Sequence, residues 1–154
     1  MGTPEQTVRV LPSTAGSATW VVTPGGCELS DLQCVEARGG LFNLYQSSTW
    51  QDVGLFTLAS EQNFGHGEIG AFGLDTISLG LTNATGGPTL DTQIIAGIET
   101  ENSYLGLFGL QQQPMNLGDF SHPRRSVLTA LRALNLIPSL SWAYTAGAHY
   151  RTNT

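Results

Sequence analysis

Residues 7–22 read TVRVLPSTAGSATWVV, and this stretch gives the first indication of the fold. Its two ends, residues 7–11 and 18–22, are rich in valine and include Trp20, which favours short β-strands because such side chains suit a pleated surface. The residues between them, 12–17, supply the proline, serines and glycine typical of a loop. We therefore predict two strands joined by a loop that begins at Pro12 and Ser13.

Further strands follow along the chain. Residues 53–58 and 93–98 are strand candidates, and residues 64–73 (FGHGEIGAFG) predict a glycine-rich hairpin followed by a strand over residues 75–79. One helix is expected over residues 123–134, with Ser121 as its N-cap and Asn135 in the left-handed conformation that ends it. The helix would bury one apolar face, made of Val127, Leu128, Leu131 and Leu134.

Composition, charge and the length of apolar runs exclude several classes of protein. The chain has 154 residues, which suits one domain, and 40% apolar residues with 19 glycines favour a turn-rich, mainly β domain. Six basic and twelve acidic residues give a net charge of −6, so a basic surface for nucleic acid is excluded. Apolar runs such as residues 105–110 are far shorter than the roughly 20 residues of a membrane span. Three scattered histidines, His66, His122 and His149, predict no metal site, and no cofactor is expected.

The cysteines and one glycosylation triplet bear on the compartment. Cys27 and Cys34 are too few for a zinc site of thiolates, and we predict a small disulfide loop, which would place the chain in an oxidising compartment. Two unrelated reduced thiols are the alternative. Asn83 begins an N-glycosylation triplet. Residues 1–9 contain no apolar signal-peptide core, so the chain is either trimmed or an intracellular descendant of a secreted family.

Five motifs share an order and spacing along the chain. They are GTPEQ (2–6), STAGSATW (13–20), Phe42 followed by SSTW (47–50), GAFGLDT (70–76) and YLGLFGL (104–110). Together they resemble the N-terminal lobe of a pepsin-like aspartic protease of the secreted fungal type. In that family the second motif is Asp-Thr-Gly-Ser-Ser-x-x-Trp, the fourth is the strand leaving the flap, and the fifth threads beside the catalytic loop. The resemblance implies a single lobe of the acid-protease β-fold with one short helix, without the family's first strand and its C-terminal lobe.

Departures from the family pattern bear on activity. The catalytic aspartate position holds Ser13, the motif glycine is Ala15, and the flap tyrosine falls at Phe64, which has no hydroxyl. Active members use two carboxylates that share a proton, and a serine hydroxyl cannot replace one of them. Ser13 has no legible base beside it, so a turn serine is the simpler interpretation. We expect no aspartic endopeptidase activity from this chain.

Three functions stay open at this point. The first is a non-proteolytic lobe that binds a peptide or a small hydrophobic molecule in the former cleft, through Thr14, Ala15, Trp20, Phe64, Gly65 and Phe108. The second is a repurposed cyclase or isomerase of fungal secondary metabolism, with His66, Glu68 and Tyr104 as acid, base or orienting groups. The third is the N-terminal lobe of a full-length endopeptidase homologue. A solvated hairpin tip is the plainer interpretation of His66 and Glu68.

Other residues have structural interpretations. Asp75 is expected at the start of a strand, and Trp20, Trp50 and Trp142 in the core or at a lobe interface. Arg124 and Arg125 either bind an anion or form a solvated surface. The missing first strand would leave residues 7–11 at a sheet edge and the face of the loop uncovered, which predicts a homodimer or pairing with a separate C-terminal lobe. Val8→Asp and Val10→Asp are expected to break that dimer.

Overall fold

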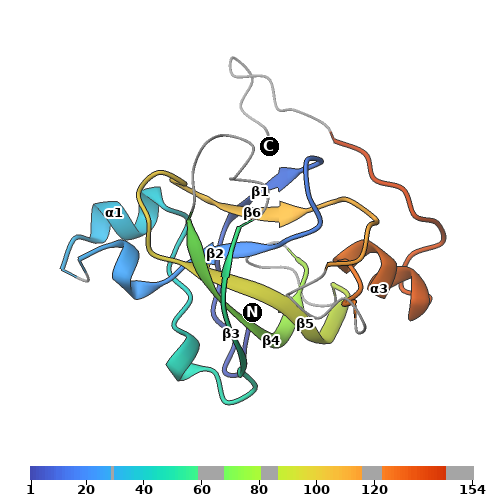
Figure 1. Cartoon of the computed structure of the whole chain (residues 1–154), viewed down its shortest axis with the longest axis horizontal. Helices are drawn as coiled ribbons and strands as arrows, with labels where there is room; N and C mark the ends of the chain where they lie inside the picture. The colour runs from blue at the N-terminus through green and yellow to red at the C-terminus, as the bar shows by residue number, and fades with distance from the viewer. Residues whose placement is uncertain (29, 59–67, 81–86, 116–122, 145–154) are drawn as a thin grey trace.

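The computed structural model describes residues 1–28, 30–58, 68–80, 87–115 and 123–144 (Figure 1). The described chain is mainly β, with one six-stranded mixed sheet in the order β1-β6-β2-β5-β4-β3. The strands are β1 (Val10–Ser13), β2 (Trp20–Val22), β3 (Gln51–Thr57), β4 (Ile69–Ser78), β5 (Thr89–Ile98) and β6 (Gly106–Gly109). The helices are α1 (Leu32–Ala37), α3 (Val127–Ala133) and the short 3-10 turns η1 (Pro24–Gly26) and η2 (Leu44–Gln46).

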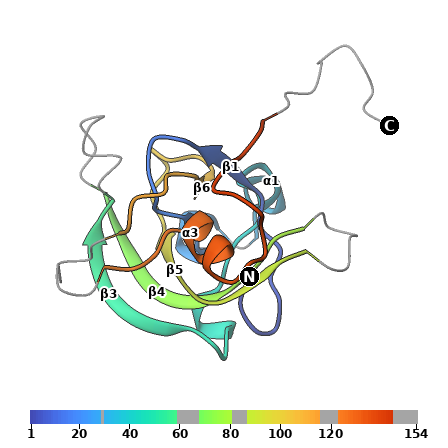
Figure 2. The ribbon, with the colours of Figure 1, turned by 90° about the vertical axis from the view of Figure 1, so that its right-hand side faces the viewer.

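The pairing places β6, the last strand in the described sequence, inside the sheet between β1 and β2. β6 lies parallel to β1 on one side and antiparallel to β2 on the other, and β2 lies parallel to β5. The hairpin ladder β3–β4–β5 is antiparallel throughout. Figure 2 shows the sheet curving strongly, with β3 and β4 on the outside of the curve. The loop that follows β1 is thereby brought against the end of β6.

Two hydrophobic clusters form the core. The first joins Val21 and Ile95 of the sheet to the apolar face of α3 and to Phe42. The second surrounds Trp20 and Phe72, and its members include Val22, Leu58, Ile94, Ala96 and Ile98. Trp50 packs over Gly73, where a Cβ atom would come within 2.3 Å of the indole, so only glycine fits. Trp20 is buried as predicted and Trp50 is half-buried, whereas Trp142 is 49% exposed and does not belong to the core.

Every predicted strand has at least one boundary that differs in the structure: β2 begins two residues later than predicted, and β3 spans residues 51–57 rather than 53–58. β1 begins at Val10 rather than residue 7, because the preceding segment lies against Gly39, whose carbonyl accepts a 2.7 Å bond from the Arg9 N–H. Residues 69–78 form one continuous strand, β4, without the predicted break before residue 75, and residues 64–67 of the predicted hairpin lie outside the described chain. β5 begins four residues earlier than expected, because Leu90 pairs with Ile77 before a bulge interrupts the alternation.

The helices also depart from the prediction. α3 is capped by Ser126, whose side chain accepts from the Thr129 N–H, and Ser121 lies outside the described residues. The earlier start was wrong because Arg124 is paired in an extended bridge with Met115. Leu134 is 60% exposed rather than buried, while Asn135 has the predicted left-handed backbone (φ 56°). The sequence pattern missed α1, which Asp31 caps by accepting from the Cys34 N–H.

Candidate functional site

The loop after β1, called here the Ser13 loop (residues 13–17), is fixed to the carboxyl end of β6. Ser13 pairs with Gly109, and the Leu110 N–H donates a 2.8 Å bond to the Ser13 carbonyl. The Gln111 N–H then donates to the Gly16 carbonyl at 3.1 Å. A Cβ at Gly109 would come within 2.5 Å of the backbone of Ser17, so this close approach requires glycine. Backbone bonds therefore hold the loop in place.

The side chains of the Ser13 loop are small and accessible. Thr14 and Ala15 are exposed, and the Ser13 hydroxyl accepts from the Ala15 N–H at 3.3 Å. A hydroxyl that bonds to the backbone two residues further on is typical of a serine turn. Among the described residues, no titratable side chain forms a hydrogen bond with Ser13. The structure therefore gives Ser13 no activating partner among the described residues.

The other residues predicted to bind a ligand differ in their placement. Phe108, on the strand beside the Ser13 loop, is half-buried and packs against the first core cluster. Trp20 is 1% exposed and belongs to the second core cluster, so the structure assigns it to packing. Its indole N–H is buried without a hydrogen-bond partner in the described chain. Phe64, Gly65, His66 and Asn83 lie outside the described residues.

Glu68 and Tyr104 occur together, but at the opposite end of β6. The Glu68 carboxylate accepts from the Thr100 hydroxyl at 2.7 Å and from the Ser103 hydroxyl at 3.4 Å. Tyr104 is 57% exposed and precedes β6 by two residues, whereas Ser13 pairs with the last residue of that strand. With a rise of about 3.3 Å per residue, the two groups are separated by about 16 Å along the strand. The structure does not bring Glu68 and Tyr104 to Ser13.

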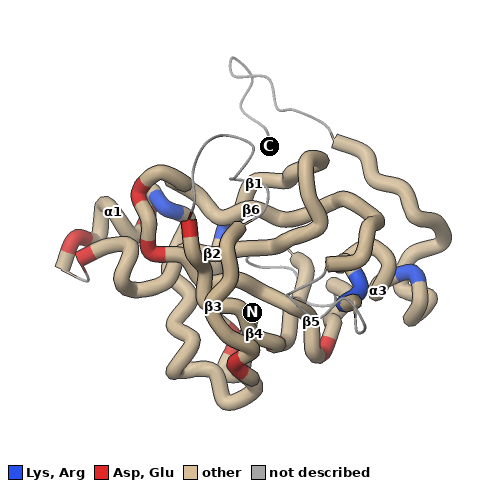
Figure 3. The backbone as a smooth tube through the Cα atoms, in the orientation of Figure 1, with Lys and Arg blue, Asp and Glu red and all other residues tan. Residues whose placement is uncertain are grey.

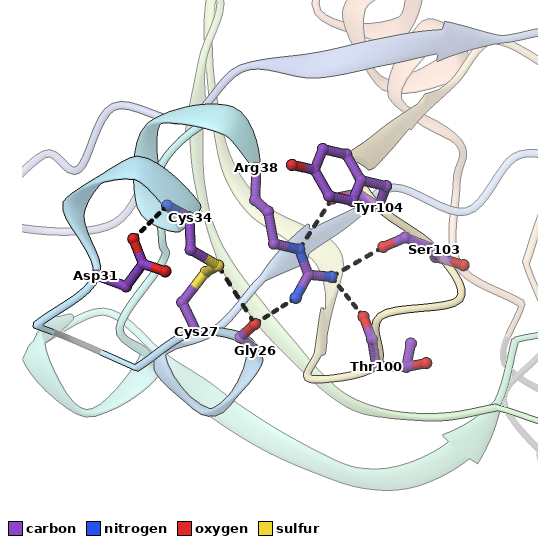
Figure 4. The surroundings of a disulfide bond; sticks show 8 residues. All are labelled: Gly26, Cys27, Asp31, Cys34, Arg38, Thr100, Ser103 and Tyr104. Atoms are coloured by element: carbon purple, nitrogen blue, oxygen red, sulfur yellow. Dashed lines mark hydrogen bonds between the residues drawn. A yellow bond between two sulfur atoms is a disulfide. The ribbon is translucent and has the colours of Figure 1, made fainter.

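A buried arginine organises this amino end of β6. Arg38 is 2% exposed and donates to the backbone carbonyls of four residues: Gly26, Thr100, Ser103 and Tyr104 (Figure 4). Its guanidinium also lies 5.9 Å from the centre of the Tyr104 ring. We call Arg38, these four residues and Glu68 the Arg38 cluster. Sequence reasoning missed it, although a single arginine followed by two glycines in a sparsely charged chain was a signal.

The predicted disulfide lies beside the Arg38 cluster. Cys27 and Cys34 are bonded, and the Cys34 sulfur lies 3.9 Å from the Gly26 carbonyl that Arg38 also contacts (Figure 4). A bonded sulfur carries no hydrogen, so this approach is a packing contact.

The disulfide indicates an oxidising compartment. In the described part of the chain, no helix is long and apolar enough to cross a membrane.

Asp75 is a structural carboxylate, although it lies within β4 rather than at a strand start. It is 1% exposed, and its Oδ1 accepts from the Thr49 hydroxyl at 2.5 Å and from the Thr76 N–H at 2.8 Å.

Burial lowers the pKa of the Met1 α-amino group. The negative charges of Glu5 and Asp75 act in the opposite direction and partly offset this shift. Within the described residues, no group of three or more potential metal ligands occurs.

Comparison with known proteins adds no assignment. No protein-family model matches the chain, and no curated protein matches it.

Proposed function

We propose that the chain is a pepsin-like lobe that does not cleave peptides and that binds a peptide or a small hydrophobic molecule on the surface of the Ser13 loop. The observation that carries the proposal is the state of Ser13, whose hydroxyl accepts from the Ala15 N–H in a loop fixed to β6. The position that the resemblance gives to the catalytic carboxylate thus holds a turn serine. Thr14 and Ala15 are exposed beside it and would contact the ligand.

The arrangement of β6 supports the resemblance to the pepsin-like lobe. The segment expected to thread beside the catalytic loop forms β6, which lies between β1 and β2 and pairs with Ser13 through Gly109. The motif Ser47–Trp50 lies against the first residues of the chain, since the Ser48 N–H donates to the Thr3 carbonyl at 2.7 Å. The motifs that carry the resemblance therefore contact one another.

The acid–base alternative has less support. A cyclase or isomerase would need a proton donor and acceptor that face the substrate. Glu68 instead accepts two hydroxyl bonds from Thr100 and Ser103, and Tyr104 packs near the Arg38 guanidinium. Both residues serve the Arg38 cluster, about 16 Å along β6 from the Ser13 loop. We therefore favour binding over catalysis.

A second copy of the chain is the partner that we propose for the uncovered face next to the loop. β1 is an edge strand of the described sheet, and Leu11 is 50% exposed on it. Pro12 has no N–H, so the edge is poorly suited to adding another strand, and side-chain contacts would have to dominate. Val8 and Val10 pack against the first core cluster, so acidic substitutions there would damage the core. Leu11→Asp is the sharper test of this surface.

The oligomeric state is measured by sedimentation equilibrium. We expect a dimer at micromolar concentration that Leu11→Asp converts to a monomer. A monomer up to hundreds of micromolar would contradict the proposed partner without affecting the proposed ligand site.

The binding proposal is tested by two assays on the same preparation. Casein and fluorogenic peptides at pH 3–6 should remain intact, with or without pepstatin. Calorimetry with pepstatin, used as an apolar peptide probe, should detect binding that Ala15→Glu weakens by about tenfold. Gln46→Glu, an equally exposed change on η2, is the matched control and should leave binding unchanged. Pepstatin-sensitive cleavage would refute the proposal, as would binding that both substitutions weaken equally.

A further inference from the structure

Exposed apolar side chains are concentrated in the chain that follows α3. Among the described residues, twelve large hydrophobic side chains are exposed, and five of these lie within residues 134–144: Leu134, Leu136, Leu140, Trp142 and Tyr144. Single exposed hydrophobic residues are ordinary on a soluble protein, but a concentration of them marks a contact with another molecule. Tryptophan and tyrosine are also enriched in such contacts. This part of the chain is therefore a candidate interaction surface.

Residues 140–144, called here the Trp142 segment, have the pattern of a β-strand without a partner. Their sequence LSWAY alternates large apolar residues with serine and alanine. In a strand, Leu140, Trp142 and Tyr144 would lie on one face. Within the described residues, the backbone N–H and C=O groups of residues 141–144 form no hydrogen bond. The segment can therefore pair with a strand of another molecule.

The Trp142 segment lies on the same side of the molecule as the Ser13 loop. The Gln112 side-chain amide donates to the Leu140 carbonyl at 3.0 Å, and the preceding Gln111 bonds to Gly16 of the loop. Figure 1 and Figure 2 both show the chain after α3 passing beside the end of β1. The segment therefore borders the face on which we propose a second copy of the chain.

Charge favours a second copy as the partner of the Trp142 segment. The chain carries a net charge of −6, yet residues 135–144 contain no acidic or basic side chain (Figure 3). Like charges directly opposite on neighbouring strands are destabilising, so a neutral segment can pair with itself. The two edge strands of the described sheet are less suited to this, because β1 contains Pro12 and β3 contains Asp52.

The exposed area sets the size of the interface. A whole tryptophan or tyrosine side chain buries about 150–250 Å², so the exposed parts of Leu140, Trp142 and Tyr144 offer roughly 300 Å² per copy. A standard interface buries about 800 Å² per partner. The segment alone is too small for a stable dimer, and the bordering face around Leu11 has to supply the remaining area. One interface made of both surfaces is therefore expected.

We infer that the Trp142 segment pairs antiparallel with the same segment of a second copy, across a two-fold axis at Trp142. The inference rests on the proposed dimer and names the strand that forms it. In this register Trp142 lies opposite Trp142 of the partner subunit, and Leu140 lies opposite Tyr144 of the partner subunit. Both contacts are apolar, and aromatic cross-strand pairs stabilise a sheet. A two-fold contact uses one surface twice, which limits the assembly to two chains.

Sedimentation equilibrium of the full chain tests the surface. Tyr144→Asp should weaken dimerisation by at least about tenfold, because it places a carboxylate on the apolar face of both strands. Tyr45→Asp is the matched control, because Tyr45 is a 98% exposed tyrosine on η2, outside the Trp142 segment, and its substitution should leave the dimer unchanged. Both side chains are exposed, so thermal melting should show that both variants remain folded.

Hydrogen exchange tests the strand pairing itself. In a two-stranded antiparallel pair, alternate residues donate their N–H groups to the partner strand. Alternate amides among residues 141–144 should therefore exchange at least about tenfold more slowly at concentrations where the dimer forms than in dilute solution. The same amides should show no dependence on concentration in Tyr144→Asp.

The outcomes separate this inference from the proposed function. A native chain that is monomeric up to hundreds of micromolar would overturn both the inference and the proposed partner. A native dimer would overturn the inference alone if Tyr144→Asp leaves it intact, if Tyr45→Asp disrupts it equally, or if the amides of residues 141–144 gain no protection. In that case Leu11→Asp still tests the face next to the Ser13 loop, and pepstatin binding tests the ligand site.

Discussion

The two ends of β6 use the same strand in different ways. At the amino end, the Arg38 cluster joins four backbone carbonyls, a carboxylate and an adjacent disulfide through side-chain contacts. At the carboxyl end, the Ser13 loop is held mainly by backbone bonds, and its small side chains remain accessible. Arginine, glutamate and tyrosine, which enzymes often use in catalysis, thus lie at the amino end of β6, where side chains make several hydrogen bonds. The Ser13 loop at the carboxyl end has none of these residue types, and its side chains are accessible.

This contrast teaches how to interpret charged and aromatic residues in a sparsely charged chain. Arg38, Glu68 and Tyr104 are the types that catalysis uses, yet the polar groups of Arg38 and Glu68 are committed to structural partners, and the Tyr104 ring lies near the Arg38 guanidinium. If the interpretation is correct, substitutions at the amino end should lower stability, and substitutions in the Ser13 loop should alter binding with little loss of stability.

The largest effect is expected from Arg38→Met. Methionine keeps much of the apolar stem but leaves four backbone carbonyls, one buried and three partly buried, without their shared donor. We expect the free energy of unfolding to fall by about 3–5 kcal/mol, measured by urea denaturation. Arg9→Met is the control, because Arg9 is exposed and donates one side-chain bond to the Glu36 carbonyl, so its loss should cost under about 1 kcal/mol. Equal losses of unfolding free energy in Arg38→Met and Arg9→Met would contradict the structural role given to the Arg38 cluster.

The disulfide should give the next largest effect. Cys27 and Cys34 close a loop with a sequence separation of seven, for which chain entropy predicts about 2–3 kcal/mol of stabilisation. The chain has only these two cysteines, so dithiothreitol acts at one place. The unfolding free energies measured by urea denaturation with and without the reductant should differ by this amount in the native chain and not in Cys27→Ser/Cys34→Ser. Identical midpoints for the reduced and oxidised native chain would contradict the prediction.

Glu68→Gln should have a smaller effect. The two hydroxyls donate to different carboxylate oxygens, and the amide keeps only one acceptor oxygen, so only one of Thr100 and Ser103 can still donate to it, without charge assistance. We expect a loss of about 1 kcal/mol in unfolding free energy. Glu101 is an exposed carboxylate on the connection between β5 and β6 that carries Thr100 and Ser103, and Glu101→Gln should change stability by less than about 0.5 kcal/mol. A Glu68 variant as stable as the Glu101 variant would remove Glu68 from the Arg38 cluster.

Ser13→Ala should have the smallest effect. The hydroxyl accepts one 3.3 Å bond from the Ala15 N–H, which solvent can replace because the loop is accessible. The expected loss of stability is below about 1 kcal/mol, and pepstatin affinity should change by less than about threefold. A stability loss above about 2 kcal/mol would show that Ser13 has a structural role comparable to that of Arg38.

Local residue patterns predicted the parts of the fold that depend on local chemistry. The β-branched runs predicted a mainly β chain, the cysteine pair predicted the disulfide, and Asn135 was recognised as the end of α3. Each of these features needs only a few neighbouring residues. The lobe identity rests on the order of the motifs and on the position of β6, and it stays a proposal.

The features that were missed depend on distant backbone groups. Arg38 bonds to carbonyls up to 66 residues away, and no residue type marks a carbonyl as an acceptor. The start of α3 is displaced by the Met115–Arg124 bridge, an isolated pair that lies outside the strands. β5 begins at Thr89, before the bulge at Thr92, because the pairing of Leu90 with Ile77 outweighs the cost of the positive φ of 62° at Thr92. Candidate sites built from such contacts therefore require the structure.

The most direct test of the central claim is an NMR titration of the ¹⁵N-labelled chain with pepstatin, followed by intact mass measurement of an added peptide substrate. We predict that amide shifts concentrate at Thr14, Ala15, Leu110 and Gln111, and that the peptide keeps its mass. Shifts concentrated at Glu68 and Tyr104, or pepstatin-sensitive cleavage of the peptide, would contradict a non-proteolytic binding surface at the carboxyl end of β6.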